Sequence, residues 1–301
     1  MSGFLIPSIQ TLFQSESNKE NLFSILIPSW NNLDLLQLCI DSIKKNSAFR
    51  HQIIVHVNEG IDGTLDWVKE NKIDSTFSTE NAGVCASLNA SAKLVNCKYI
   101  VYMNDDMYVC PNWDKFLFDE IQKRNDDLFY YSSTMIEFEK SSSKAVYSPF
   151  DFGRDKKSFR EDELLKFLSN DSNLPANWYG SCWPPSIVSK RVWDLVGGYD
   201  EQFSPGFYSD PDFGMKCWQL GIRDFKGIGK SLVYHFKSKS TGRVIRNDGR
   251  KTFAQKWGIP SSYLYENMLR MGQKVDGTEL KNPGGINYFF AKMKAKWIAI
   301  K

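Results

Sequence analysis

The stretch that decides the fold covers residues 98–109 and reads KYIVYMNDDMYV. Residues 99–103 form a short apolar run rich in β-branched and aromatic side chains, which is typical of a strand buried on both faces. The run ends at Asn104, Asp105 and Asp106. Two adjacent carboxylates in such a place raise each other's pKa, and a bound cation such as Mg²⁺ or Mn²⁺ removes that cost. The alternative interpretation is a solvated turn, in which Asn and Asp are common.

Units of strand, loop and helix precede this stretch. The predicted strands cover residues 23–28, 51–58 and 76–79, and the predicted helices cover 33–45, 65–71 and 83–95. This repeated order implies right-handed crossovers and a largely parallel α/β sheet. Ligands of such sheets bind beyond the carboxyl ends of the strands, where all the polar loops between these elements fall.

The chain after the central strand is less regular. Helices are predicted over residues 113–124, 189–196 and 213–220, and strands over 128–133 and 231–235. A polar stretch lies near residues 141–157. The pattern indicates a second, more variable half that carries substrate-specific loops.

Composition limits the class of protein. The 301 residues are 42% hydrophobic and 24% charged, with a net charge of +3, so whole-chain charge gives no case for nucleic acid. Six cysteines lack metal-ligand spacing and lie mostly in apolar runs, which predicts reduced core thiols: Cys39, Cys85, Cys97, Cys110, Cys182 and Cys217. The first residues do not resemble a signal peptide, and no window approaches the ~18 apolar residues of a membrane span. We therefore expect a cytoplasmic protein, with peripheral attachment to the inner membrane face as an option.

The tail of the chain predicts an amphipathic helix over residues 286–300. With about 100° per residue, one arc of about 100° contains Ile286, Phe289, Phe290, Met293, Trp297 and Ile300. Lysines lie mainly beside the arc. The arc either contacts a membrane surface or packs on the protein's own core or on a second copy.

Motifs in a fixed order resemble glycosyltransferase family 2, which has the inverting GT-A fold. They read SILIPSWNN, VHVNEGIDGT, ENAGVCASLNASAK, YIVYMNDDMYV and GGYDEQFSPGFYSDPDFGMKCWQLG, and the resemblance covers residues 22–240. It implies a Rossmann-like, mostly parallel sheet with helices on both faces and a smaller acceptor-side region. The implied division is a nucleotide-sugar-binding half over 1–110, an acceptor-binding half over 111–240, and a C-terminal extension over 241–301.

The resemblance also implies a donor site. By motif position its residues are Pro28, Ser29, Trp30, Asn58, Glu59, Asn81, Gly83, Asn89 and Asp105. Asn58 or Glu59 stands at the acidic position that hydrogen-bonds the base, and the Asn is a departure from the family's usual acidic pair. The identity of the base therefore stays open.

Metal ligands and a catalytic base are implied in the same way. Asp106 matches the residue that coordinates the divalent ion, and His235 fits a histidine that some members use as a further ligand; a lone strand-end histidine is otherwise structural. Asp210 aligns with the general base, although Ser209 replaces the family's usual Glu. Asp212 could instead cap the following helix.

Acceptor contacts are the least specific part of the resemblance. Trp183 and Tyr208 are candidates because flat aromatic faces stack on sugars, and core packing is the competing interpretation.

Together these features predict a metal-dependent glycosyltransferase, with Mn²⁺ or Mg²⁺ as cofactor. It would move one sugar from a nucleotide-sugar to a glycan or lipid-linked acceptor in surface polysaccharide synthesis, with no nucleic-acid partner and homo-oligomers left open. A catalytically silent glycan-binding or scaffold member is the alternative. A nucleotidyltransferase would need a Gly-rich basic phosphate loop, which IPSWNN does not provide.

Overall fold

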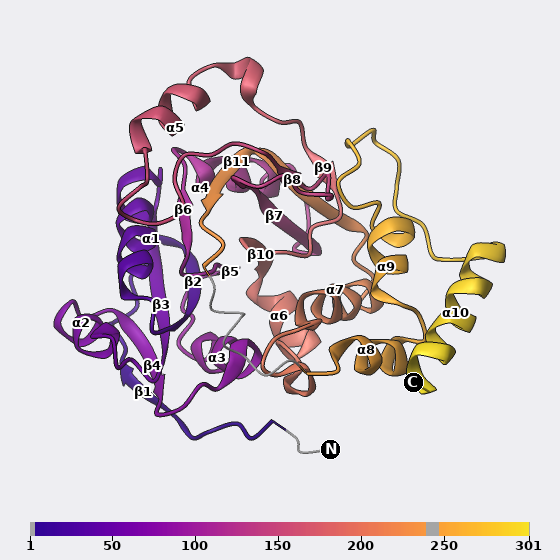
Figure 1. The fold of residues 1–301 in the computed structure, drawn as a ribbon, viewed down its shortest axis with the longest axis horizontal. Helices are drawn as coiled ribbons and strands as arrows, with labels where there is room; N and C mark the ends of the chain where they lie inside the picture. Colours follow the sequence, from indigo (N-terminus) through magenta and orange to yellow (C-terminus); the bar gives the residue numbers. More distant parts are fainter. Residues whose placement is uncertain (1–3, 239–246, 301) are drawn as a thin grey trace.

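The computed structural model describes residues 4–238 and 247–300. The strands are β1 (Ile9–Phe13), β2 (Asn21–Trp30), β3 (Arg50–Asn58), β4 (Asp74–Ser78), β5 (Tyr99–Tyr102), β6 (Met107–Val109), β7 (Phe129–Ile136), β8 (Val146–Tyr147), β9 (Trp178–Tyr179), β10 (Ser186–Ser189) and β11 (Asp224–His235). The helices are α1 (Leu33–Asn46), α2 (Thr64–Glu70), α3 (Gly83–Ala92), α4 (Trp113–Ile121), α5 (Glu161–Leu168), α6 (Lys190–Val196), α7 (Ser209–Gln219), α8 (Gly249–Trp257), α9 (Ser261–Tyr263) and α10 (Gly285–Ile300). Figure 1 shows how they are arranged.

One sheet runs through the described chain. Its main path has the order β1-β4-β3-β2-β5-β10-β7-β11-β6. The block β4-β3-β2-β5 is parallel throughout, as predicted from the strand–loop–helix units. Beyond it, β10 is antiparallel to both of its neighbours, and β11 is parallel to β7 but antiparallel to β6. The predicted α/β fold is confirmed.

Two apolar layers cover the sheet, because successive residues of a buried strand face opposite sides. In β2, Ile25 and Ile27 pack with α1, α2 and α4 on one face. Leu26 packs with α3, α6 and α7 on the other face. All six cysteines are buried and free, which confirms the prediction of core thiols. Within the described ranges no helix is long and apolar enough to cross a bilayer.

Strand β11 is longer than the predicted 231–235, since it begins at Asp224. Gly227 lies inside it. The Trp178 ring covers Gly227, and an ideal Cβ there would lie 1.8 Å from Trp178 Cε2. Trp178 Nε1 also donates to Thr134 Oγ1 at 2.8 Å, which fixes the ring in place. Gly227 is therefore needed for close approach of the ring to the strand.

Gly227→Ala is expected to lower the free energy of unfolding by about 3 kcal/mol, because a methyl group there overlaps a ring that is held by a hydrogen bond. Urea unfolding measures the change. Gly284→Ala is the matched control, since a Cβ at Gly284 meets nothing within 4 Å, and we expect a change within about 0.5 kcal/mol. Equal losses for the two variants would contradict the packing argument.

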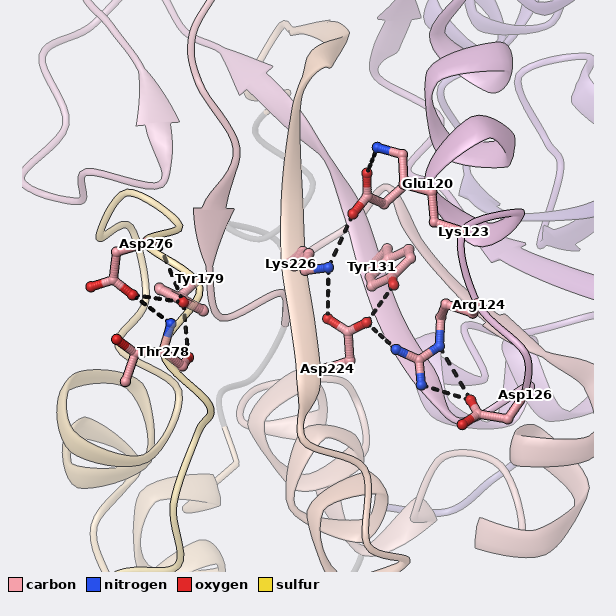
Figure 2. A network of polar contacts seen from close by, with 10 residues as sticks. All are labelled: Glu120, Lys123, Arg124, Asp126, Tyr131, Tyr179, Asp224, Lys226, Asp276 and Thr278. Atoms are coloured by element: carbon pink, nitrogen blue, oxygen red, sulfur yellow. Dashed lines mark hydrogen bonds and ion pairs between the residues drawn. The ribbon is translucent and has the colours of Figure 1, made fainter.

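A polar network joins the end of α4 to β7 and β11, as Figure 2 shows. The Asp224 carboxylate accepts from Tyr131 Oη at 2.6 Å, pairs with Lys226 at 3.2 Å, and binds the Arg124 guanidinium. Lys226 also pairs with Glu120 at 3.0 Å. Each carboxylate thus has a cationic partner, which partly buried charges require. The network fixes α4 against the far half of the sheet.

The chain after α9 returns to the sheet at β9. The Tyr179 hydroxyl lies 2.8 Å from Asp276 Oδ1 and 2.8 Å from the Thr278 carbonyl oxygen (Figure 2). The Arg270 guanidinium lies 4.6 Å from the centre of the Tyr179 ring. These contacts attach the C-terminal segment to the main body. The segment boundaries at 110 and 240 stay predictions.

Candidate active site

A cavity of about 660 Å³ lies at the carboxyl ends of β2, β3 and β5. Most of the predicted site residues line it: Pro28, Ser29, Trp30, Asn58, Asn81, Gly83, Asp105, Asp106, Trp183, Asp210 and His235. Other residues that were not predicted as site residues also line it, and among these are Tyr102, Met135, Pro205, Phe207 and Lys237. The parallel strands bring the residues that follow β2, β3, β4 and β5 to one edge of the sheet, as expected for this topology.

Strand pairing brings His235 to the acidic motif. In the antiparallel β6–β11 pair, His235 is opposite Met107, the residue directly after Asp106. His235 Nε2 consequently lies 3.5 Å from Asp106 Oδ2, and its Nδ1 lies 2.9 Å from Glu137 Oε1. The Ser238 amide donates to Asp106 Oδ2 at 2.7 Å. The imidazole is therefore held between two carboxylates.

The opposite charges of His235 and Asp106 shift the pKa values of the two side chains in opposite directions. Burial alone would lower the pKa of His235, but the charges and hydrogen bonds of Asp106 and Glu137 outweigh it and raise the pKa to about 9. Burial would raise the pKa of Asp106, yet the His235 charge and the Ser238 amide hold it below its usual range. In the ligand-free protein at neutral pH, a protonated His235 therefore balances the negative charge of its neighbours.

The residues present fit a divalent ion. Asp106 lines the cavity. Its Oδ1 is buried and has no hydrogen-bond partner among the described residues. A carboxylate oxygen in that condition is a suitable ligand for Mg²⁺ or Mn²⁺. No group of three or more His, Cys, Asp or Glu side chains in the described chain is arranged to hold an ion. Asp106 and His235 would thus leave other ligand positions to a bound diphosphate and water.

Asp105 is placed differently from Asp106. It accepts a hydrogen bond from Ser29 Oγ at 2.8 Å, which joins the loop after β5 to the end of β2. Both residues line the cavity. This contact fixes the Asp105 carboxylate at the cavity wall, next to Asp106 in the chain.

The side chain of Asn58 bonds to the backbone of two segments at the edge of the cavity. Its Oδ1 accepts from the Ala82 amide at 2.8 Å, and its Nδ2 donates to the Ser29 carbonyl oxygen at 3.2 Å. Asn58 is buried. Glu59 instead accepts from Asn31 Nδ2 at 2.8 Å and does not line the cavity. Asn58 thus joins the end of β2 to the turn before α3, and Glu59 lies outside the cavity lining.

Asn89 and Tyr208 also lie outside the cavity lining, in contrast to their predicted roles. Asn89 Nδ2 donates to the Tyr199 carbonyl oxygen at 2.8 Å, and its Oδ1 accepts from the Tyr199 amide at 2.9 Å. It therefore fixes the turn that contains Gly198 and Tyr199. Tyr208 has a φ of +71° before α7 and packs toward Phe253, with ring centres 6.3 Å apart. The core-packing interpretation describes Tyr208 better than acceptor stacking.

Asp210 occupies the first turn of α7 and faces the cavity. Burial raises its pKa to about 7, although a hydrogen bond from Tyr199 Oη at 3.4 Å opposes the rise. Tyr102 lies near enough to Asp210, Asp105 and Asp106 that burial and their charges keep its own pKa well above the usual value. A carboxyl with a pKa near 7 has the property that a general base needs near neutral pH.

Asp212 neither caps α7 nor lines the cavity. Its Oδ1 lies 2.7 Å from Lys256 Nζ and accepts from Trp257 Nε1 at 2.8 Å. Lys256 also pairs with Asp200 at 2.6 Å. Asp212 therefore attaches α8 to the helix turn that carries Asp210.

Lys256→Met is expected to lower the free energy of unfolding by about 3 kcal/mol, because it leaves the fully buried Asp212 charge without its partner. Urea unfolding of a double-mutant cycle with Asp212→Asn provides the control. The double variant should recover part of the loss, since the isosteric amide carries no charge. Strictly additive losses would contradict this coupling.

The loop before α7 packs tightly against α3. The Val84 amide donates to the Pro205 carbonyl oxygen at 2.8 Å. Gly83 has a φ of +74°, and an ideal Cβ there would lie 2.7 Å from Pro205 Cα. Only glycine allows this approach, so Gly83 joins the predicted donor side to the Asp210 side of the cavity. Trp183, whose Nε1 donates to Tyr265 Oη at 3.4 Å, forms part of the wall.

Comparisons with known proteins agree with this geometry. The family model Glycosyl transferase family 2 matches residues 24–178, just over half of the chain. A hyaluronan synthase from Pasteurella multocida is 21% identical over 275 residues, which cover 85% of this chain and 24% of that protein. The chain therefore spans about a quarter of the length of that curated relative.

Solved structures of S. aureus TarS share the fold. TarS 1-349 in complex with UDP-GlcNAc matches with a TM-score of 0.54 and 14% identity, covering 78% of this chain and 66% of that chain. TarS 1-349 alone matches with a TM-score of 0.51 and 15% identity, covering 71% and 60%. The family match covers more than half of the chain and the fold agrees with it, so the chain belongs to glycosyl transferase family 2.

Proposed function

We propose that this member of glycosyl transferase family 2 is an inverting glycosyltransferase that depends on Mn²⁺ or Mg²⁺. It moves one sugar from a nucleotide-sugar to a glycan or lipid-linked acceptor, in the synthesis of a polysaccharide. One observation carries the proposal. A single cavity contains an acidic motif beside a histidine and, separately, the carboxyl group of Asp210 with its pKa raised to about 7.

The donor class is supported by the cavity and by a relative. Ser29, Asn81 and Gly83 line the cavity at the ends of parallel strands, where nucleotides bind in such sheets. TarS, which shares the fold, has a structure in complex with UDP-GlcNAc. A uridine nucleotide is therefore the first donor to test. A polysaccharide product is suggested by the similarity to a hyaluronan synthase.

The proposed reaction is a single displacement. Asp210 accepts the proton of the acceptor hydroxyl, and that oxygen forms a bond to the anomeric carbon of the donor sugar. The bond from this carbon to the phosphate oxygen breaks, and the nucleoside diphosphate leaves with the electron pair. A divalent ion held by Asp106 and His235 would supply Lewis-acid stabilisation of the diphosphate. Attack opposite the leaving group inverts the anomeric configuration.

Calorimetric titration with UDP, GDP and dTDP, each with Mn²⁺ and with EDTA, tests the donor site. We expect one nucleotide to bind with Mn²⁺ and to bind much more weakly with EDTA. If none of the three nucleotides gives a heat of binding, the donor proposal is contradicted and a catalytically silent, scaffold-type member of the family is favoured. Equal binding in EDTA would contradict the metal dependence alone.

A further inference from the structure

Helix α10 packs on the protein through the side opposite to the predicted apolar arc. Ala291, Ala295 and Ile298 are buried, and the last two form an apolar cluster with Ala254 of α8. Gln255 of α8 donates to the Ala299 carbonyl oxygen at 3.2 Å. The helix is therefore docked on α8, and the side chains that dock it do not belong to the predicted apolar arc.

The predicted apolar arc faces solvent instead. Its large side chains are between 54% and 83% exposed: Ile286, Phe289, Phe290, Met293, Trp297 and Ile300. Of the alternatives left open by the sequence, packing of this arc on the protein's own core is wrong, because Ala291, Ala295 and Ile298 on the opposite face fill that role. Six large exposed side chains on one stripe of one helix form an apolar surface of the kind that marks an interaction site. Figure 1 shows α10 at the edge of the molecule.

The charge beside this stripe has one sign. Residues 281–301 contain five lysines and neither Asp nor Glu. Lys294 and Lys296 flank the arc on its two sides at about 100° per residue, and both are exposed, as is Lys292. Such a helix has apolar side chains to enter an acyl layer and lysines to reach the phosphates around it.

We propose that this face of α10 docks the enzyme on an anionic lipid bilayer, with the helix lying in the plane of the surface. A second copy of the chain is the less suitable occupant. Two copies of the same stripe, paired about a twofold axis, would bring the lysine rows of Lys294 and Lys296 together without any acidic side chain of residues 281–301 to neutralise them. Lipid phosphates provide the complementary charge.

Vesicle co-flotation of the full chain tests the proposal. Vesicles of phosphatidylcholine alone are compared with vesicles of phosphatidylcholine mixed with phosphatidylglycerol. We expect binding to the mixed vesicles that weakens with added salt. Phe290→Ser/Met293→Ser should abolish it, and Lys294→Gln/Lys296→Gln should weaken it by about tenfold or more. Leu195→Ser on α6 is the matched control, because Leu195 is also exposed, by 57%, on a different helix.

Specific outcomes would overturn the proposal. One is an absence of binding to either vesicle, and another is equal binding of Phe290→Ser/Met293→Ser and wild type. A dimer in sedimentation velocity that Phe290→Ser/Met293→Ser makes monomeric would assign the face to a second copy. Thermal unfolding of each variant checks the fold. Nucleotide titration should be unchanged in every α10 variant, so the result is independent of the proposed donor site.

Discussion

Replacing Asp210 with Asn is expected to abolish sugar transfer while leaving nucleotide binding near the wild-type level. The amide cannot accept the proton of the acceptor hydroxyl, so the loss in kcat should be about a thousandfold or more. Asp106, the predicted metal ligand, is unchanged in this variant. Steady-state transfer and calorimetric titration of nucleotide measure the two effects. A variant that transfers sugar at the wild-type rate would show that another group is the base.

The same substitution should stabilise the fold at alkaline pH. The pKa of Asp210 is raised from 3.8 to about 7 in the folded protein, so its anion is destabilising above the unfolded value. Such a rise costs up to about 4 kcal/mol, and solvent in the cavity reduces this to about 2 kcal/mol. The gain of Asp210→Asn should be absent below pH ~4, grow toward pH ~7 and then level off. Urea unfolding at several pH values measures it, with the exposed Asp41→Asn as control.

The pH profile of transfer should report the same group. A base works only when deprotonated, so kcat/KM should fall about tenfold per pH unit below pH ~7 and level off above it. A flat profile between pH 5 and 8 would contradict Asp210 as the base.

Replacing Asp106 with Asn is expected to weaken metal-dependent nucleotide binding by about a hundredfold or more, because the anionic ligand is lost. The amide keeps an oxygen to accept from the Ser238 amide, so the loop should stay folded. Titration of nucleotide at increasing Mn²⁺ measures the change. Glu139→Gln is the matched control, since this exposed carboxylate pairs with Lys237 and lies outside the cavity lining. An unchanged Mn²⁺ dependence in Asp106→Asn would contradict its role as ligand.

Local patterns are sufficient to predict the parallel block of the sheet. The strand ending at Trp30, the strand ending at Asn58 and the strand before Asn104 all lie where the apolar runs indicate. Their shared edge follows from the βαβ order alone. That order therefore suffices to place the acidic motif beside the nucleotide loops.

Long-range pairing cannot be predicted in the same way. His235 pairs with Met107, the residue after Asp106, and lies 129 positions after Asp106 in the chain; nothing in the local sequence sets the β6–β11 register. Strand β10 escapes prediction because it is only four residues long and fits between β5 and β7 in the middle of the sheet. Resemblance alone assigns the histidine to the metal, and the strand register gives the physical reason for its position.

Polar side chains that bond to other parts of the protein are hard to tell from ligand-binding residues in the sequence. Asn89 has the residue type and motif position of a ligand-binding residue, but its amide bonds to the Tyr199 backbone and to Glu201. Asp212 looks like a helix cap, yet its partner Lys256 lies 44 positions later in the chain, on a different helix. A sequence shows that such groups need partners without showing whether the partner is a ligand or the protein.

The most direct test of the account is the anomeric configuration of the transferred sugar, followed by proton NMR from the first turnovers with a divalent ion present. Displacement by one base at Asp210 predicts a product with the opposite configuration to the donor, formed by wild type and absent with Asp210→Asn or EDTA. A product that retains the donor's configuration, or equal turnover by Asp210→Asn, would contradict the single-displacement mechanism.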